Sequence, residues 1–171
     1  MTVDPEALFV ANQQRLFRYF RRAVGQADAA RDLTQDVFLR VIRAAVPAVS
    51  DGELRGWLFA IARNLALDHY RKRARQTGPA APVEASRLPS QDVDVAVNQA
   101  LATLAELDRD VFLMREVAGL GYEEIAAACG LTAGAVRSRI HRARLQLRAQ
   151  LAAPIATRRT MPLRRSGASR E

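Results

Sequence analysis

The chain has 171 residues, of which 49% are hydrophobic and 26% are charged, and its formal net charge is +8. This hydrophobic fraction excludes a chain that is disordered throughout, and the length suffices for one ordinary domain or two small ones. The single cysteine excludes an intramolecular disulfide, and one cysteine with two histidines gives no basis for a metal site.

The sequence also lacks the usual signs of membrane insertion and of catalysis. The N-terminal residues show no charged leader followed by an apolar run, and no stretch approaches the roughly 18 apolar residues that a membrane span needs. No glycine-rich phosphate loop, metal-binding carboxylate group or nucleophile with a neighbouring base occurs. We therefore expect a cytoplasmic protein with no direct membrane insertion, no enzymatic activity and no cofactor.

Two helices are predicted at the start of the chain. The first has Asp4 as its N-cap and Pro5 at its first helical position. The second begins at about Asp28, and its outward face carries one apolar residue in a polar row: Asp32, Gln35, Asp36, Leu39 and Arg43. Taken alone, this row is best interpreted as an ordinary exposed face, because single exposed apolar residues are common. A surface for a protein partner is the alternative.

A third helix is predicted over residues 54–75, with Ser50 and Glu53 forming a capping box before it. Its outward side is expected to carry Arg63, Asn64, Asp68, Arg71 and Lys72. Such a polar and basic surface suits unpaired single-stranded DNA, which is bound through its phosphates and through extruded bases. Trp57 lies close by, and we expect it to belong to the core.

The composition changes over residues 76–97, where three prolines stand in a background of glycine, alanine and serine. This composition is typical of a flexible linker. No alternation typical of strands occurs on either side. We therefore predict an all-α protein of two small helical domains, residues 1–75 and 98–150, joined by the linker 76–97. A basic tail, 151–171, follows and is expected to be disordered.

The second domain contains the pattern of a helix-turn-helix. Ala126 provides a small residue where two helices cross, Gly130 suits a turn with positive φ, and Val136 seats the second helix in the core. Thr132 is placed to cap that second helix. We interpret the helix that follows Thr132 as a recognition helix.

The recognition helix is predicted to bury Val136, Ile140, Ala143 and Leu147. Arg137, Ser138, His141 and Arg142 then project outward near its N-terminal half, where such a helix meets base edges in the major groove. Arg139, Arg144 and Arg148 are better placed for phosphates. A solvated basic face of no particular purpose is the alternative.

Three segments occur in the order seen in one protein family. Residues 28–44, "DAARDLTQDVFLRVIRA", 54–75, "LRGWLFAIARNLALDHYRKRAR", and 100–147 together resemble the extracytoplasmic-function class of bacterial RNA polymerase sigma factors. The resemblance implies that 28–44 binds core RNA polymerase, that 54–75 melts and reads the downstream promoter element, and that 100–147 reads the upstream element.

The resemblance also implies roles for residues and partners. Asp32, Gln35, Asp36 and Leu39 would contact a coiled-coil segment of the largest polymerase subunit. The implied partners are core RNA polymerase, promoter DNA and an anti-sigma factor. Gly121 stands where relatives usually have Ser or Thr, which weakens the cap of the short helix after it.

Two other functions are compatible with parts of the sequence. A free-standing helix-turn-helix regulator would use the second domain alone and would leave the first without a role. An adaptor that binds acidic proteins through its basic faces would show no preference among DNA duplexes and only a shallow dependence on salt. The three motifs in family order favour the sigma factor over both.

Overall fold

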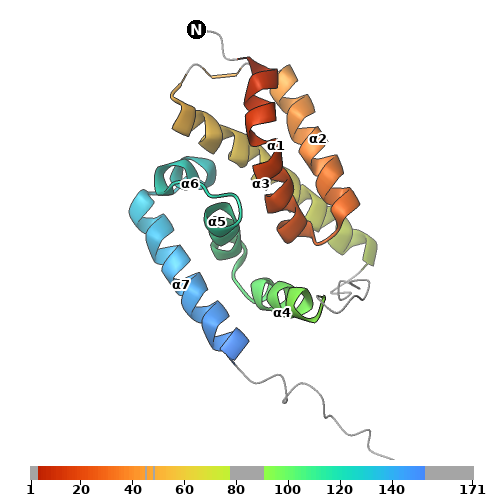
Figure 1. Ribbon diagram of the computed structural model, residues 1–171, viewed down its shortest axis with the longest axis vertical. Coiled ribbons are helices and arrows are strands. Elements are labelled where there is room, and N and C mark those ends of the chain that lie inside the picture. The colour runs from red at the N-terminus through yellow and green to blue at the C-terminus, as the bar shows by residue number, and fades with distance from the viewer. Residues whose placement is uncertain (1–3, 45, 48, 78–90, 153–171) are drawn as a thin grey trace, which may run out of the picture.

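The computed structural model describes residues 4–44, 46, 47, 49–77 and 91–152, and all regular structure in this part of the chain is helical (Figure 1). Its helices are α1 (Pro5–Val24), α2 (Ala27–Arg43), α3 (Asp51–Thr77), α4 (Gln91–Ala102), α5 (Glu106–Glu116), α6 (Tyr122–Cys129) and α7 (Ala133–Ala152). The all-α prediction is confirmed. Among the described residues, no helix is long and apolar enough to cross a membrane.

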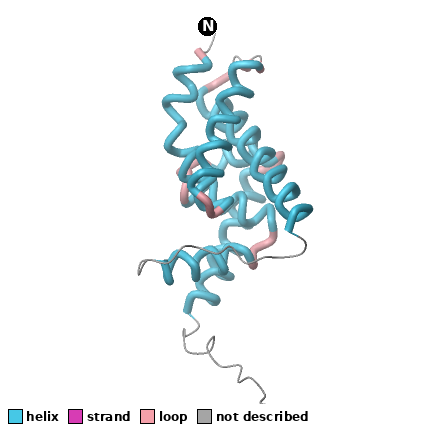
Figure 2. Tube along the Cα trace, turned by 90° about the vertical axis from the view of Figure 1, so that its right-hand side faces the viewer, coloured by secondary structure: helices cyan, strands magenta, loops and turns pink. Residues whose placement is uncertain are grey.

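The first lobe consists of α1, α2 and α3. The helices α1 and α2 lie side by side, and α3 crosses behind both of them (Figures 1 and 2). The side chains that meet between these helices are fully buried and mostly large: Leu16, Tyr19, Phe20, Val37, Leu58 and Phe59. The short turn between α1 and α2 ends α1 at Gly25, whose φ of 78° is one that glycine adopts without strain.

Local capping fixes where these helices begin, as predicted. The Asp4 side chain accepts a hydrogen bond from the Glu6 backbone N–H at 3.0 Å, and Pro5 follows it at the first position. Before α3, the Glu53 carboxylate accepts from both the backbone N–H and the hydroxyl of Ser50, at 3.1 and 2.7 Å. These hydrogen bonds lower the pKa of Glu53.

The second lobe consists of α4 to α7. Helix α7 runs along its outer side and packs on α5, α6 and α4 (Figure 1). Its interior is formed by Val111, Met114, Ile125, Val136 and Ile140, each no more than 2% exposed. The lobe therefore has a small apolar core, and the predicted recognition helix covers one side of it.

The predicted linker differs from the structure at its C-terminal end. Residues 91–97 form the first turns of α4. They are part of the predicted linker because prolines and small residues precede them. Val97, Ala100 and Leu101 follow helical spacing and pack against the core, which explains the helix. The predicted boundaries differ in two further places: residues 76 and 77 of the predicted linker end α3, and residues 151 and 152 of the predicted tail end α7. The remaining residues of the linker, 78–90, and of the tail, 153–171, lie outside the described residues.

The two lobes are in direct contact, and their buried apolar residues form one continuous cluster. Helix α6 packs closely on α3, and α5 lies against α1 (Figure 1). This contact brings the first helix of the helix-turn-helix onto the helix that the sequence assigned to the downstream element.

Candidate nucleic-acid and polymerase interfaces

The helix-turn-helix has the geometry that its sequence predicted. Ala126 and Val136 are 6% and 0% exposed, and Gly130 has a φ of 65° at the turn. The Ala135 backbone N–H donates to the Thr132 hydroxyl at 3.2 Å, so Thr132 caps α7 as expected. Leu131 continues the turn by donating its backbone N–H to the Ala126 carbonyl at 2.9 Å.

The outward row of α7 lies opposite its buried side. Successive residues of a helix point about 100° apart, so Ser138, His141 and Arg142 face away from Val136 and Ile140. All three outward side chains are exposed. Arg142 lies 3.8 Å from Asp108 but keeps 60% of its side chain exposed, so it is available to an external ligand.

Two arginines that the sequence assigned to phosphates are already engaged within the lobe. Arg139 pairs with Asp108 at 2.6 Å and is only 28% exposed. Arg144 pairs with Glu116 at 2.5 Å and is 49% exposed, and this pairing raises its pKa. The sequence reasoning missed both acids, although the acidic residues of α5 were visible in the sequence.

The outward surface of α3 contains four of its five predicted members. Asn64, Asp68, Arg71 and Lys72 are exposed. Asp68 and Arg71 lie 3.6 Å apart, one turn from each other, in a weak exposed ion pair. Trp57 is partly buried and packs against the core, as predicted. His69 is partly buried beside them, and burial, together with Arg73 and Lys72, lowers its pKa.

The expectation that Arg63 belongs to this outward surface is wrong. Its Nε atom donates to Asp110 of α5 at 2.8 Å, and only 20% of the Arg63 side chain and 3% of that of Asp110 are exposed. The physical reason is position on the helix, because Arg63 lies about 100° around α3 from Asn64 and faces the second lobe. A buried carboxylate needs a cation beside it, and Arg63 is that cation.

Arg63 is part of a stripe along α3 that contacts the second lobe. Gly56, Arg63 and Tyr70 are seven residues apart and so share one side of the helix. A Cβ atom at Gly56 would lie 2.9 Å from both the Ala127 Cβ and the Glu124 carbonyl oxygen, so glycine permits the close approach of α6. The Arg109 guanidinium lies 4.8 Å from the centre of the Tyr70 ring.

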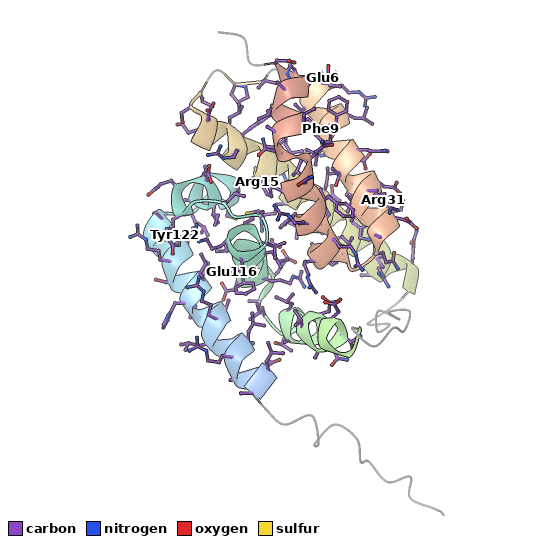
Figure 3. All side chains as sticks on the ribbon, viewed as in Figure 1. Glu6, Phe9, Arg15, Arg31, Glu116 and Tyr122 are labelled. Atoms are coloured by element: carbon purple, nitrogen blue, oxygen red, sulfur yellow. The ribbon has the colours of Figure 1, made fainter. Side chains whose placement is uncertain are left out.

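Polar contacts also link the lobes at their edges. Arg55 of α3 pairs with Glu124 of α6 at 2.5 Å. Arg15 of α1, which is labelled in Figure 3, donates to the Ala118 carbonyl at 3.4 Å. Glu124 also accepts a hydrogen bond from the Gly121 backbone N–H at 2.6 Å. This second bond gives α6 half of a capping box, which offsets the missing side chain at Gly121.

Burial changes the acid–base behaviour of the groups between the lobes. It raises the pKa of the Asp110 carboxyl, and the neighbouring Arg63 opposes that change. It raises the pKa of the Tyr19 hydroxyl, which has no hydrogen-bond partner among the described residues. It also raises the pKa of the Cys129 thiol to about 11. Because the thiolate is the reactive form, we expect Cys129 to react slowly at neutral pH.

The predicted partner surface on α2 is exposed along its whole length. Asp32, Gln35, Asp36 and Leu39 all face solvent, and Leu39 is 46% exposed. Ile42, which the sequence reasoning did not include, is 53% exposed one turn further on. Two exposed apolar side chains in succession on a polar face fit a surface that binds another protein.

A groove of about 700 Å³ between α1 and α2 adjoins this surface. Its lining joins aromatic, amide and basic side chains: Phe9, Gln13, Gln14, Phe17, Arg18, Arg31, Thr34 and Gln35. Phe9, which is labelled on α1 in Figure 3, packs on Phe38 of α2 with ring centres 4.6 Å apart. Gln35 belongs to both features, so the groove extends the predicted partner surface toward α1.

Comparisons with known proteins give the class of the chain. Residues 8–76 match the family described as Sigma-70 region 2, and residues 94–147 match Sigma-70, region 4. Together these regions cover the α2, α3 and α7 surfaces described above.

Related proteins narrow the class further. Over 148 residues the chain is 38% identical to the ECF RNA polymerase sigma factor SigC of Mycobacterium tuberculosis, covering 81% of this chain and 78% of that protein. It is also 38% identical over 149 residues to the ECF sigma factor SigE of Mycolicibacterium smegmatis, of which the match spans only 58%. The chain belongs to the extracytoplasmic-function (ECF) RNA polymerase sigma factors.

Solved structures show the same fold. The sigma factor RpoE of Bartonella quintana, in complex with the anti-sigma factor NepR, aligns with a TM-score of 0.65 and 26% identity over 86% of this chain and 96% of that one. CnrH, in complex with the cytosolic domain of CnrY, aligns with a TM-score of 0.65 and 27% identity over 86% of each chain.

Proposed function

We propose that the chain binds core RNA polymerase in the cytoplasm, recognises promoter DNA and initiates transcription of a specific set of genes. The observation that carries this proposal is the presence of both sigma regions in one chain, with the exposed α2 surface on the first. A free-standing helix-turn-helix regulator would need only the second lobe.

Each surface has a proposed role in this function. The α2 surface of Asp32, Gln35, Asp36 and Leu39 contacts the polymerase through its polar and apolar members. Ser138, His141, Arg142 and Arg137 read the upstream element, and Arg148 contacts phosphates. Arg144 keeps enough exposure to contact a phosphate while it holds Glu116.

The downstream element is assigned to the exposed surface of α3, formed by Asn64, Asp68, Arg71 and Lys72. Its polar groups suit an extruded base, and its cations suit the phosphates of an unpaired strand. Arg63 and Arg139 are assigned instead to the stability of the fold, because each holds a buried or half-buried carboxylate.

The chain acts by binding and carries out no reaction of its own. Unstacking costs a few kcal/mol for each base step, so contacts with the captured bases and with the polymerase must supply the energy of opening. We also propose an anti-sigma factor as a partner. The complex of the sigma factor RpoE with the anti-sigma factor NepR supports this part of the proposal.

The experiment that tests the proposal is transcription by purified core RNA polymerase on a library of promoter fragments, with and without the chain. The test variant is Asp32→Asn with Asp36→Asn. Its control is Glu6→Gln with Asp28→Asn, two exposed acids of the same lobe whose loss changes the net charge equally. We expect the chain to direct initiation, the test variant to lower initiation at limiting concentration by about tenfold, and the control to retain it.

The opposite result is equally well defined. The proposal fails if the chain never directs initiation but binds particular duplex sequences tightly by itself, which is the behaviour of a free-standing regulator. Equal losses in the test and control variants would reject the α2 surface while leaving the sigma function in place.

A further inference from the structure

Three elements of the second lobe meet at the ring of Tyr122, the first residue of α6. The Arg115 guanidinium of α5 lies 4.8 Å from the ring centre, and the Arg137 guanidinium of α7 lies 5.1 Å from it. Tyr122 lies at the outer edge of the molecule beside α7, with Glu116 of α5 nearby (Figure 3). Both distances are within the range of cation–π contacts.

The position of the ring is fixed from the side that faces the lobe. Arg115 donates from Nη1 to the Leu120 carbonyl at 2.7 Å, which ties α5 to the loop before α6. The Gly121 backbone N–H is held by the Glu124 carboxylate. Tyr122 is itself partly buried and packs against the core. The ring is therefore a rigid platform, whereas Arg137 is exposed above it.

Arg137 is held differently from two other arginines of α7, Arg139 and Arg144. Arg139 and Arg144 use N–H groups to bind carboxylates of α5. The contact of Arg137 is with the face of a ring, which uses none of its five N–H donors. Stacking thus restricts where the guanidinium plane lies and leaves the whole donor edge for another ligand.

We propose that Tyr122 is a positioning residue for Arg137, and that the ligand of Arg137 is the major-groove edge of a guanine in the upstream element. Arg137 lies in the first turns of α7, where a recognition helix meets base edges. Two parallel hydrogen bonds to guanine require the guanidinium plane to align with the base. A platform that sets this plane before binding lowers the cost of ordering a long side chain.

The inference rests on the proposed function, so its test uses the holoenzyme of core polymerase and full-length chain. Promoters with a randomised upstream element are selected by initiation, and the base preference at each position is compared between variants. Tyr122→Leu removes the ring, Tyr122→Phe keeps it, and Arg137→Lys keeps the charge without the planar fork. Arg148→Ala is the control for an arginine assigned to phosphates.

We expect one guanine preference to fall by about three- to tenfold in Tyr122→Leu, and the same position to lose its preference in Arg137→Lys. Tyr122→Phe should retain the wild-type preference. Arg148→Ala should weaken all sequences alike. Thermal unfolding shows whether each variant is folded, and if Tyr122→Leu is not, Tyr122→Met is the second variant without a ring.

Two results would overturn the inference. In the first, Arg137→Lys loses a base preference but the ring-free variants keep it, so that Arg137 reads DNA without its platform. In the second, Arg137→Lys keeps every preference. If the wild-type chain directs no initiation, the proposed function fails, and the same selection by duplex binding to the chain alone still decides between these outcomes.

Discussion

Helices α3 and α7 are both rich in arginine, but they use these side chains in different directions. On α3, Arg55 and Arg63 reach across to acids of the other lobe, Glu124 and Asp110. On α7, Arg139 and Arg144 reach to acids of α5 in their own lobe. On both helices, a further set of cations faces solvent. Each helix therefore has arginines that stabilise the fold and exposed cations that are available to bind another molecule. A partner acid that is buried or half-buried identifies the arginines of the first group.

The largest expected effect concerns Arg63. Arg63→Gln should lower the free energy of unfolding by about 3 kcal/mol, because it removes the cation that is hydrogen-bonded to the buried Asp110 carboxylate. The matched control on the same helix is Arg71→Gln, whose ion pair with Asp68 is exposed and should contribute less than about 1 kcal/mol. Urea unfolding measures both. Equal losses of stability in the two variants would show that the buried and the exposed cations of α3 do not differ in their contribution to the fold.

The close contact at Gly56 gives the next effect. Gly56→Leu should cost about 2 kcal/mol or force the lobes apart, because the added atoms meet the backbone of α6. Gly134→Ala is the control, since a Cβ atom there has only the Thr132 hydroxyl within 4.0 Å. Thermal unfolding and small-angle scattering report the two outcomes. If Gly56→Leu changed neither the radius of gyration nor the stability, this would contradict the described packing of α6 on α3.

A pH dependence follows from Asp110. Its pKa is raised in the folded chain, so the native state holds this proton more tightly than the unfolded state does. The contribution of Asp110 to stability therefore falls as pH rises from its ordinary pKa, near 3.8, through the raised one. The stability of the wild type relative to Asp110→Asn should decline across this window. A relative stability that rises with pH would mean that Arg63 outweighs burial.

The smallest effect is chemical. Because the pKa of the Cys129 thiol is about 11, only a minute fraction is thiolate at pH 8. Iodoacetamide should label the native chain much more slowly than the urea-unfolded chain. Rapid labelling of the native chain would contradict this prediction. It would show that the Cys129 thiol is more accessible to the reagent than its burial indicates.

Features that depend on neighbouring residues in the chain were predictable from the sequence. The caps at Asp4, Ser50 and Thr132 and the turn at Gly130 each follow from the hydrogen bonds or backbone angles of a few adjacent residues. The exposed row on α2 and the recognition helix follow from helical spacing alone. For the same reason, the family could be identified from short segments in order.

The buried ion pair of Arg63 could not be predicted in the same way. Its partner Asp110 is 47 residues away, and no local pattern connects them. The available signal was the seven-residue spacing of Gly56, Arg63 and Tyr70, which gives α3 a second contact side. The stack of Arg137 on Tyr122 was missed for a similar reason, because it depends on how α6 meets α7.

The central claim is that the arginines paired with buried or half-buried carboxylates stabilise the fold, whereas the exposed cations bind the DNA. Its most direct test compares Arg63→Gln and Arg139→Gln with Lys72→Gln and Arg148→Gln. Within the described part of the chain, no ion pair involves Lys72 or Arg148. Holoenzyme binding to a selected promoter is measured as a function of salt, beside thermal unfolding of each chain.

We predict that Lys72→Gln and Arg148→Gln each reduce the slope of log affinity against log salt by about 0.7 to 0.9, with little change in unfolding temperature. Arg63→Gln and Arg139→Gln should lower the unfolding temperature and leave the slope unchanged. The contrary result is a reduced salt slope in Arg63→Gln and Arg139→Gln with unchanged stability. It would contradict the central claim and would assign Arg63 and Arg139 to DNA binding.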